Sequence, residues 1–185
     1  MKRLRLAAAA ALALSTPARA DEITDTLQSA LDAYQAGDVA FALQDLAYAT
    51  QLLNALKAEG LATFLPPAPD GWTRTDNSEI GQSLGFMGGG TAAEASYEGG
   101  GRDVTLTLMA DNPMVTAMAG MFGNATLMAQ AGKVTRIGRI SFVDQGGEIT
   151  GLVGNRVLVQ AKGDTEAAFE LLGAMDLRGL SEFGS

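Results

Sequence analysis

Apolar residues recur at helical spacing between residues 21 and 64. The first run has them at i, i+4, i+7, i+8 and i+11, namely Ile23, Leu27, Ala30, Leu31 and Tyr34. The second run continues the same spacing with Val39, Ala42, Leu43, Leu46, Ala49, Leu53 and Leu56. Steps of three and four residues place side chains on one side of an α-helix. The pattern therefore predicts two amphipathic helices.

Gly37 and Asp38 separate the two runs. Glycine readily adopts the left-handed conformation that ends a helix, and aspartate caps the start of the next one. Because this link is short, residues 21–64 are expected to form an antiparallel helical hairpin. Phe41, Tyr48 and Leu52 widen the apolar side of the second helix beyond what one neighbouring helix can cover. We therefore expect that helix to pack also on the rest of the protein or on a partner.

Part of this hairpin resembles the central portion of one tetratricopeptide repeat. The matching positions are Tyr34, Gly37, Asp38, Ala42, Leu46 and Ala49. The resemblance implies hairpin geometry. No second copy follows in the sequence, and such arrays need about three repeats to bury a continuous core. A peptide-binding superhelix is therefore not expected.

Residues 65–72, Leu-Pro-Pro-Ala-Pro-Asp-Gly-Trp, end the helical region. Three prolines in four residues stop a helix and stiffen the chain, and Asp70-Gly71 is typical of a turn. We expect this segment to be a hinge. Beyond it the apolar period changes to two, as in Val104, Leu106 and Leu108, which alternate with threonines. Alternation of this kind indicates a half-buried strand.

Further strands are expected on both sides of Gly138 within 134–143, with a bulge there, and at 148–153 and 157–161. Turn residues about ten apart favour an antiparallel meander. One inserted helix is predicted at 113–128, capped by Asp111 or Asn112, and one C-terminal helix at 166–175. The glycine-rich segment at about 81–101 has a weak pattern; we expect much of it to be mobile and some of it to be strand, especially 95–97. The domain at 73–185 is thus predicted to be α+β, one body with a helical appendage.

The first twenty residues have the order of a secretory signal peptide. Lys2, Arg3 and Arg5 precede the apolar run 6–14, and Pro17-Ala18-Arg19-Ala20 ends in a small-x-small pattern. Cleavage is expected before Asp21. The apolar run is half the ~20 residues that a membrane-spanning helix needs. We therefore expect a soluble periplasmic protein of a bacterium, without a membrane span.

Composition removes several classes of function. The 185 residues include no His and no Cys, so a site built on imidazole or thiolate ligands and a Ser-His or Cys-His nucleophile are excluded. Removal of the four basic residues of the leader lowers the formal net charge from −8 to −12. This acidity disfavours nucleic-acid binding, which requires clustered Lys and Arg. No cofactor is predicted.

The most distinct candidate site is a row of methionines at i, i+4 and i+7 in the predicted inserted helix: Met114, Met118 and Met121. Methionine commonly fills an irregular core, and this is the commonest use of such a row. Thioethers also suit Cu(I), and a flexible Met-bearing helix suits an apolar groove for a lipid, a peptide or a partner helix. Exposure of the three side chains separates these interpretations.

Other chemical motifs favour structural roles. The acids at 21–25 and 164–170 do not match a calcium loop and suit helix ends, and the glycine triplets lack the residues of a nucleotide loop. Arg102, Arg136, Arg139 and Arg156 are expected in ion pairs. A carboxylate or Ser–Lys hydrolase is the remaining enzyme class, but none of Lys57, Lys133 and Lys162 stands in a Ser-x-x-Lys pattern.

Residues 65–72 and Asp111-Asn112-Pro113-Met114, together with the predicted layout, resemble a group of uncharacterised bacterial periplasmic proteins. That resemblance implies no activity. The pattern favours a non-enzymatic accessory protein that binds another periplasmic or envelope protein. Candidate contact residues are Met114, Met118, Met121, Phe41, Tyr48 and Leu52. The alternative is a periplasmic carrier of a small apolar ligand or Cu(I), with the methionines as the site.

Overall fold

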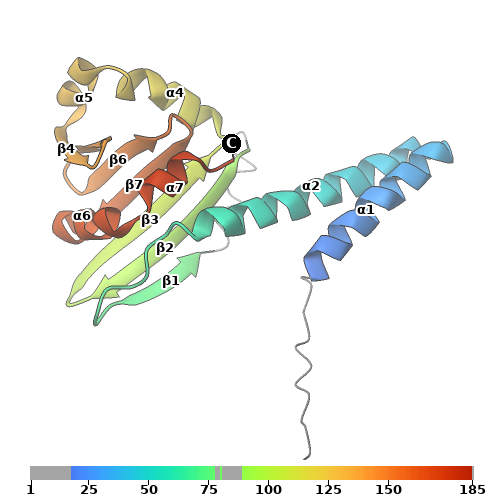
Figure 1. Cartoon of the computed structure of the whole chain (residues 1–185), viewed down its shortest axis with the longest axis horizontal. Helices are drawn as coiled ribbons and strands as arrows, with labels where there is room; N and C mark the ends of the chain where they lie inside the picture. Colours follow the sequence, from blue (N-terminus) through green and yellow to red (C-terminus); the bar gives the residue numbers. More distant parts are fainter. Residues whose placement is uncertain (1–17, 78–79, 81–88, 185) are drawn as a thin grey trace, which may run out of the picture. The chain divides into compact units, whose positions relative to one another are not determined.

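A computed structural model describes residues 18–77, 80 and 89–184 of the chain (Figure 1). Most of the predicted leader and residues 81–88 of the glycine-rich segment lie outside this part. The chain divides into two compact units, one ending at Leu53 and one beginning at Asn54. The boundary lies within a helix and not at the predicted hinge 65–72. The predicted α+β class is confirmed, with a helical hairpin followed by an antiparallel sheet.

The hairpin consists of α1 (Ala18–Gln35) and the first part of α2 (Val39–Ala62). Gly37 has φ of 84°, and its N–H donates to the Tyr34 carbonyl at 3.1 Å. The Asp38 N–H donates to the Ala33 carbonyl at 2.9 Å, which completes a Schellman motif at the end of α1. Asp38 Oδ1 in turn accepts from the Phe41 N–H at 3.0 Å and caps α2. The roles predicted for Gly37 and Asp38 are confirmed.

The second unit is built on a sheet whose seven described strands are all antiparallel. In chain order they are β1 (Thr73–Asn77), β2 (Thr91–Gly99), β3 (Arg102–Ala110), β4 (Lys133–Ile137), β5 (Ile140–Asp144), β6 (Glu148–Val153) and β7 (Val157–Gly163). The spatial order is β1-β2-β3-β7-β6-β5-β4. Pairing of β3 with β7 joins the N-terminal and C-terminal strands into one sheet.

Four helices of this unit follow β3 or β7. They are α4 (Pro113–Phe122), α5 (Ala125–Ala131), α6 (Thr165–Ala174) and α7 (Leu177–Ser181). The predicted single helix 113–128 is therefore wrong in one respect, because Asn124 interrupts it. Asn124 Oδ1 accepts from the Thr126 N–H at 2.9 Å and so starts α5 as a new helix. Asp164 caps α6 as its position predicts, accepting from the Ala167 N–H at 2.9 Å.

The main core lies between one face of the sheet and α6, α7 and the last turns of α2 (Figure 1). Alternate residues of β2, β3, β6 and β7 point into it, as the period of two requires. Its largest fully buried side chains are Tyr97, Phe142, Leu61, Leu106, Leu108, Ile149, Leu171, Leu172 and Leu180. A smaller cluster on the other face consists of Val115 of α4 with Leu152 and Leu158.

Two local predictions need correction. Gly138 does not form a bulge: with φ of 59° it starts the tight turn between β4 and β5, where Ile137 pairs with Ile140. The strand expected especially at 95–97 extends over all of residues 91–99, which were expected to be mobile in large part. Gly100 and Gly101, with φ of 59° and 75°, form the two-residue turn to β3. This pair of positive φ angles is typical of a type I′ hairpin turn.

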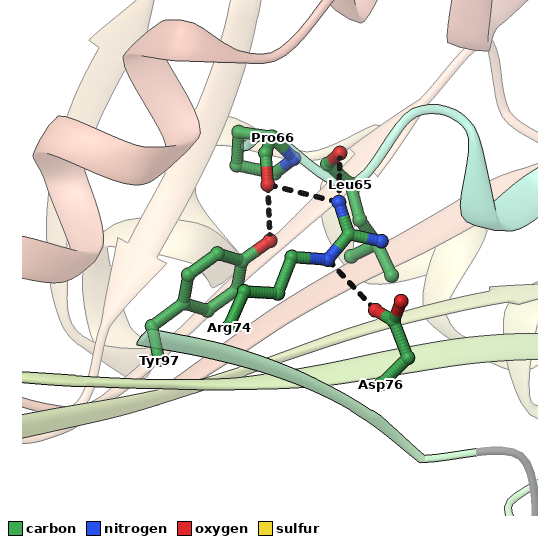
Figure 2. A network of polar contacts seen from close by, with 5 residues as sticks. All are labelled: Leu65, Pro66, Arg74, Asp76 and Tyr97. Atoms are coloured by element: carbon green, nitrogen blue, oxygen red, sulfur yellow. Dashed lines mark hydrogen bonds and ion pairs between the residues drawn. The ribbon is translucent and has the colours of Figure 1, made fainter. Parts of the chain in front are cut away.

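Hydrogen bonds fix the proline-rich segment to the sheet (Figure 2). Arg74 Nη1 donates to the carbonyls of Leu65 and Pro66 at 2.9 and 3.1 Å, and Arg74 Nε donates to Asp76 at 2.7 Å. The buried Tyr97 hydroxyl donates to the same Pro66 carbonyl at 2.7 Å. Two sheet residues thus satisfy the carbonyls that the prolines leave without helical partners. The segment is anchored in the second unit by these bonds.

Candidate functional site

The contact between α1 and α2 is made of small side chains. The buried residues of the first unit are Ile23, Ala30, Ala42 and Ala49. The leucines of the two predicted stripes are not among them, although their spacing suggested an interhelical role. Alanines occupy most of the buried positions between the two helices, and the larger side chains lie on the flanks of the contact. The hairpin therefore has its small residues inside and its large ones outside.

Seven large apolar side chains on one flank of this unit are well exposed, and we call them the apolar face. They are Leu27 (41%), Leu31 (47%), Tyr34 (67%), Val39 (54%), Leu43 (62%), Leu46 (46%) and Leu53 (46%). Three come from α1 and four from α2. A monomeric protein rarely leaves so many large apolar side chains together in water.

Helical geometry places all seven on the same side of the hairpin. On α1, Leu27 and Leu31 lie to one side of the buried Ala30, and on α2, Leu43 and Leu46 lie in the same rotational sense from the buried Ala42. In an antiparallel pair of helices that face each other, equal rotations from the contact line point to the same side of the pair. The two rows therefore form one continuous surface.

The predicted contact residues of α2 lie on the opposite rotational side. Phe41 and Tyr48 are 46% and 45% exposed, and Leu52 is half-buried. The Tyr48 hydroxyl donates to Glu22 of α1 at 2.7 Å. This hydrogen bond and the negative charge of Glu22 raise the pKa of Tyr48. The sequence thus led to the flank of α2 that carries the hydrogen bond from Tyr48 to Glu22. The apolar face was missed, although its seven residues belong to the two predicted apolar stripes.

All the charge carried by residues 21–53 is negative. This part of the chain contains six acids and neither Lys nor Arg. On α1, helical spacing puts Asp25 and Asp32 beyond the outer edge of the apolar face, behind Leu31 and Gln28. Asp45 lies between the helices, and its Oδ2 is buried with no hydrogen-bond partner in the described part of the chain. The apolar face itself carries no charged residue.

The three methionines do not gather around one opening. Met114 is 44% exposed, and Met118 packs with Val115 against Leu152 and Leu158 of the sheet. Met121 is half-buried near the end of α4. The packed side of α4 is therefore centred on Val115, while Met114 lies outside it. This arrangement is that of a helix seated on a sheet by part of its apolar surface.

Three of the remaining charged candidates have local partners. Arg102 lies 3.6 Å from Asp164 and stacks over Trp72, and Arg156 donates to the Gly184 carbonyl at 2.7 Å. Lys57 pairs with Asp111. The described residues include no group of three or more acids that could hold a metal ion. The predicted structural use of Arg102 agrees with its ion pair.

The sheet face that α4 covers in part also carries polar side chains that bond to one another. Glu94 accepts from Asn77 at 2.8 Å and from Thr107 at 2.7 Å. Glu148 accepts from Gln160 at 2.6 Å and lies 3.5 Å from Lys162. Both carboxylates have partners on neighbouring strands, as is usual for the solvated face of an antiparallel sheet. These contacts account for the positions of both carboxylates, and no bound ligand is needed to explain them.

Comparison with protein-family models, curated proteins and solved structures gave no match. Within the described residues, no helix combines the length and apolar character that crossing a membrane requires. Packing within the protein accounts for most of the other candidate residues but not for the exposed side chains of the apolar face. The apolar face is the candidate functional site.

Proposed function

We propose that this protein is a non-enzymatic accessory protein of the bacterial periplasm that acts by binding another envelope protein through its helical hairpin. The predicted leader supports the compartment, and the apolar face supports the mode of action. Burial of one large apolar side chain contributes about 1.5–3 kcal/mol relative to full exposure. Seven half-exposed ones therefore offer a partner several kcal/mol of favourable binding free energy.

One observation carries the proposal: seven large apolar side chains lie outside the hairpin, while its buried residues are three alanines and Ile23. A hairpin stabilised only for itself would gain more by turning Leu43 or Leu46 toward the other helix. The opposite arrangement is useful when a second surface covers the outer side. Binding of apolar helices in this way is a common mode of protein recognition.

The carrier alternative has less support. A site for Cu(I) or an apolar ligand needs the thioethers to converge on one space. Met118 contacts the sheet cluster at Leu158, whereas Met114 is 44% exposed. The geometry thus favours a packing role for the part of α4 that carries Met118.

Site-specific crosslinking in living cells tests the proposal. A photoreactive residue at Leu31 or Leu43 of the apolar face should give the same crosslinked protein. One at Gln44, which is also exposed and follows Leu43 on α2 but points to another side of the helix, should not. The variant Leu31→Gln with Leu43→Gln should abolish co-purification of that protein, while the unfolding free energy changes by less than about 1 kcal/mol. Equal crosslinking from Leu43 and Gln44, or none from either, would contradict the proposal.

A further inference from the structure

The proposed function leaves open what kind of surface covers the apolar face. Resting on that proposal, we infer that the occupant is an amphipathic helix of the partner protein that carries Lys or Arg beside its apolar stripe. Three properties of the hairpin point to this class: the length of the face, its exposed area and the sign of the surrounding charge.

The length of the face suits one helix. Val39 and Leu53 mark its ends on α2, and at 1.5 Å per residue they lie about 21 Å apart along the helix axis. A partner helix of about four turns spans this distance. The rows of α1 and α2 lie on the same side of the hairpin, so a third helix lying along them can place side chains at i, i+3, i+4 and i+7 against both rows.

The exposed area is sufficient for a specific complex. From their exposed fractions, the seven side chains present on the order of 700 Å², close to the ~800 Å² that each partner buries in an interface of standard size. Leu43 and Leu46 lie near the middle of the α2 row. Central apolar anchors of this kind contribute most of the binding free energy in protein interfaces.

The negative charge of the hairpin favours a partner helix with positive charge. Residues 21–53 hold six acids and no base, and Asp25 and Asp32 lie on the side of α1 beyond Gln28, which forms the α1 edge of the face. The α2 edge, with Ala40, Ala47 and Gln51, is uncharged. A partner helix with Lys or Arg on the side toward α1 is attracted, whereas an acidic one is repelled.

The same charge disfavours a second copy as the occupant. Two hairpins would bring together twelve acids with no base to pair with them, so self-association would be opposed at low ionic strength. Anionic lipid surfaces would be repelled for the same reason. Salt dependence therefore distinguishes the candidates: salt weakens binding of a basic helix and strengthens pairing of acidic copies.

Three synthetic helical peptides of equal apolar sequence test the inference, with Lys, Gln or Glu at the flanking positions. Their affinities for the purified protein are measured by calorimetry. The Lys peptide should bind about tenfold or more tightly than the Glu peptide at low salt, and this ratio should shrink in about 0.5 M salt. Leu43→Gln should weaken all three peptides. Asp25→Asn with Asp32→Asn should weaken only the Lys peptide.

The outcomes separate this inference from the proposed function. Equal affinity of the three peptides, with loss in Leu43→Gln, would overturn the basic partner and leave helix binding intact. Sedimentation of the protein as a dimer that Leu43→Gln dissociates would show a second copy on the face and overturn the inference. A monomer that binds none of the peptides overturns the inference; if crosslinking from Leu31 and Leu43 also fails, the proposed function fails with it.

Discussion

The two units of this chain bury opposite kinds of side chain. In the hairpin the buried set is Ile23 and three alanines, and the leucines are at the surface. In the sheet unit the buried set includes Tyr97 and Phe142, both fully inaccessible. Burial of apolar area drives folding in both, so the sheet unit derives far more of its stability from its own core. The hairpin retains apolar area that a partner can use.

This difference explains why helical period alone does not identify a core. Leu43 and Ala42 are neighbours in the same predicted stripe, yet they are 62% and 5% exposed. In β3 of the sheet unit, buried and half-buried residues alternate, so period two separates the two faces of this strand clearly. In the hairpin the apolar stripe is wider than the contact between the helices. The alanines of the stripe are buried in that contact, and most of its large residues are exposed.

The largest expected effect is on the unfolding free energy, when a phenylalanine is replaced by alanine in each of the two units. Phe142→Ala removes a fully buried ring that packs on Gly151, and it should lower the unfolding free energy of the sheet unit by about 3–5 kcal/mol. Phe41→Ala, at a side chain that is 46% exposed, should change that of the hairpin by less than about 0.5 kcal/mol. Urea denaturation followed by Trp72 fluorescence measures the first change, and hydrogen exchange of α2 measures the second. Similar costs at both sites would remove the contrast between the units.

A smaller effect concerns the anchor of the proline-rich segment. Burial of the Tyr97 hydroxyl, which donates to the Pro66 carbonyl, raises the pKa of Tyr97 to about 12 by removing the charged form from water. The unfolded tyrosine ionises near pH 10, whereas the folded one stays neutral. Its contribution to stability is therefore complete below pH 10 and is lost as the pH rises toward 12, by about 2 kcal/mol.

The variant Tyr97→Phe isolates this contribution. At neutral pH it should cost about 0.5–1.5 kcal/mol through the lost hydrogen bond to Pro66. Between pH 10 and 12 its unfolding free energy should decline less than that of the unaltered protein, because Tyr97 no longer titrates. Urea denaturation across this range gives both slopes. Parallel slopes would mean that Tyr97 ionises in the folded state as readily as in the unfolded one.

Most of the fold could be predicted from local signals. Gly37-Asp38 placed the hairpin turn, Asp164 placed the start of α6, and alternation in 104–108 placed β3. The split at Asn124, whose side chain caps α5, was missed. Residues 91–99 were missed as a strand because three alanines in them weaken the alternation, although β3 pairs with their whole length and β1 with part of it.

The candidate site could be predicted only in part. The apolar stripes of α1 and α2 contain all seven residues of the apolar face, so its members were already visible in the helical spacing. Their exposure was not, because it depends on how α1 and α2 pack against each other. The distance between two helices is set by the whole contact, and no local pattern reports it.

The smallest expected effect tests whether the hairpin is adapted to its own stability. Asp45 lies in the alanine contact with Oδ2 buried and unbonded among the described residues. Asp45→Ala removes this unsatisfied oxygen and introduces a better helix former, so it should raise the unfolding free energy of the hairpin by roughly 1 kcal/mol. Gln51→Ala, at an exposed position of the same helix, controls for helix propensity and should gain only a few tenths of a kcal/mol. Hydrogen exchange of α1 and α2 measures both variants. A loss of stability in Asp45→Ala would mean that the carboxylate is satisfied in solution and that the contact is tuned for the hairpin itself.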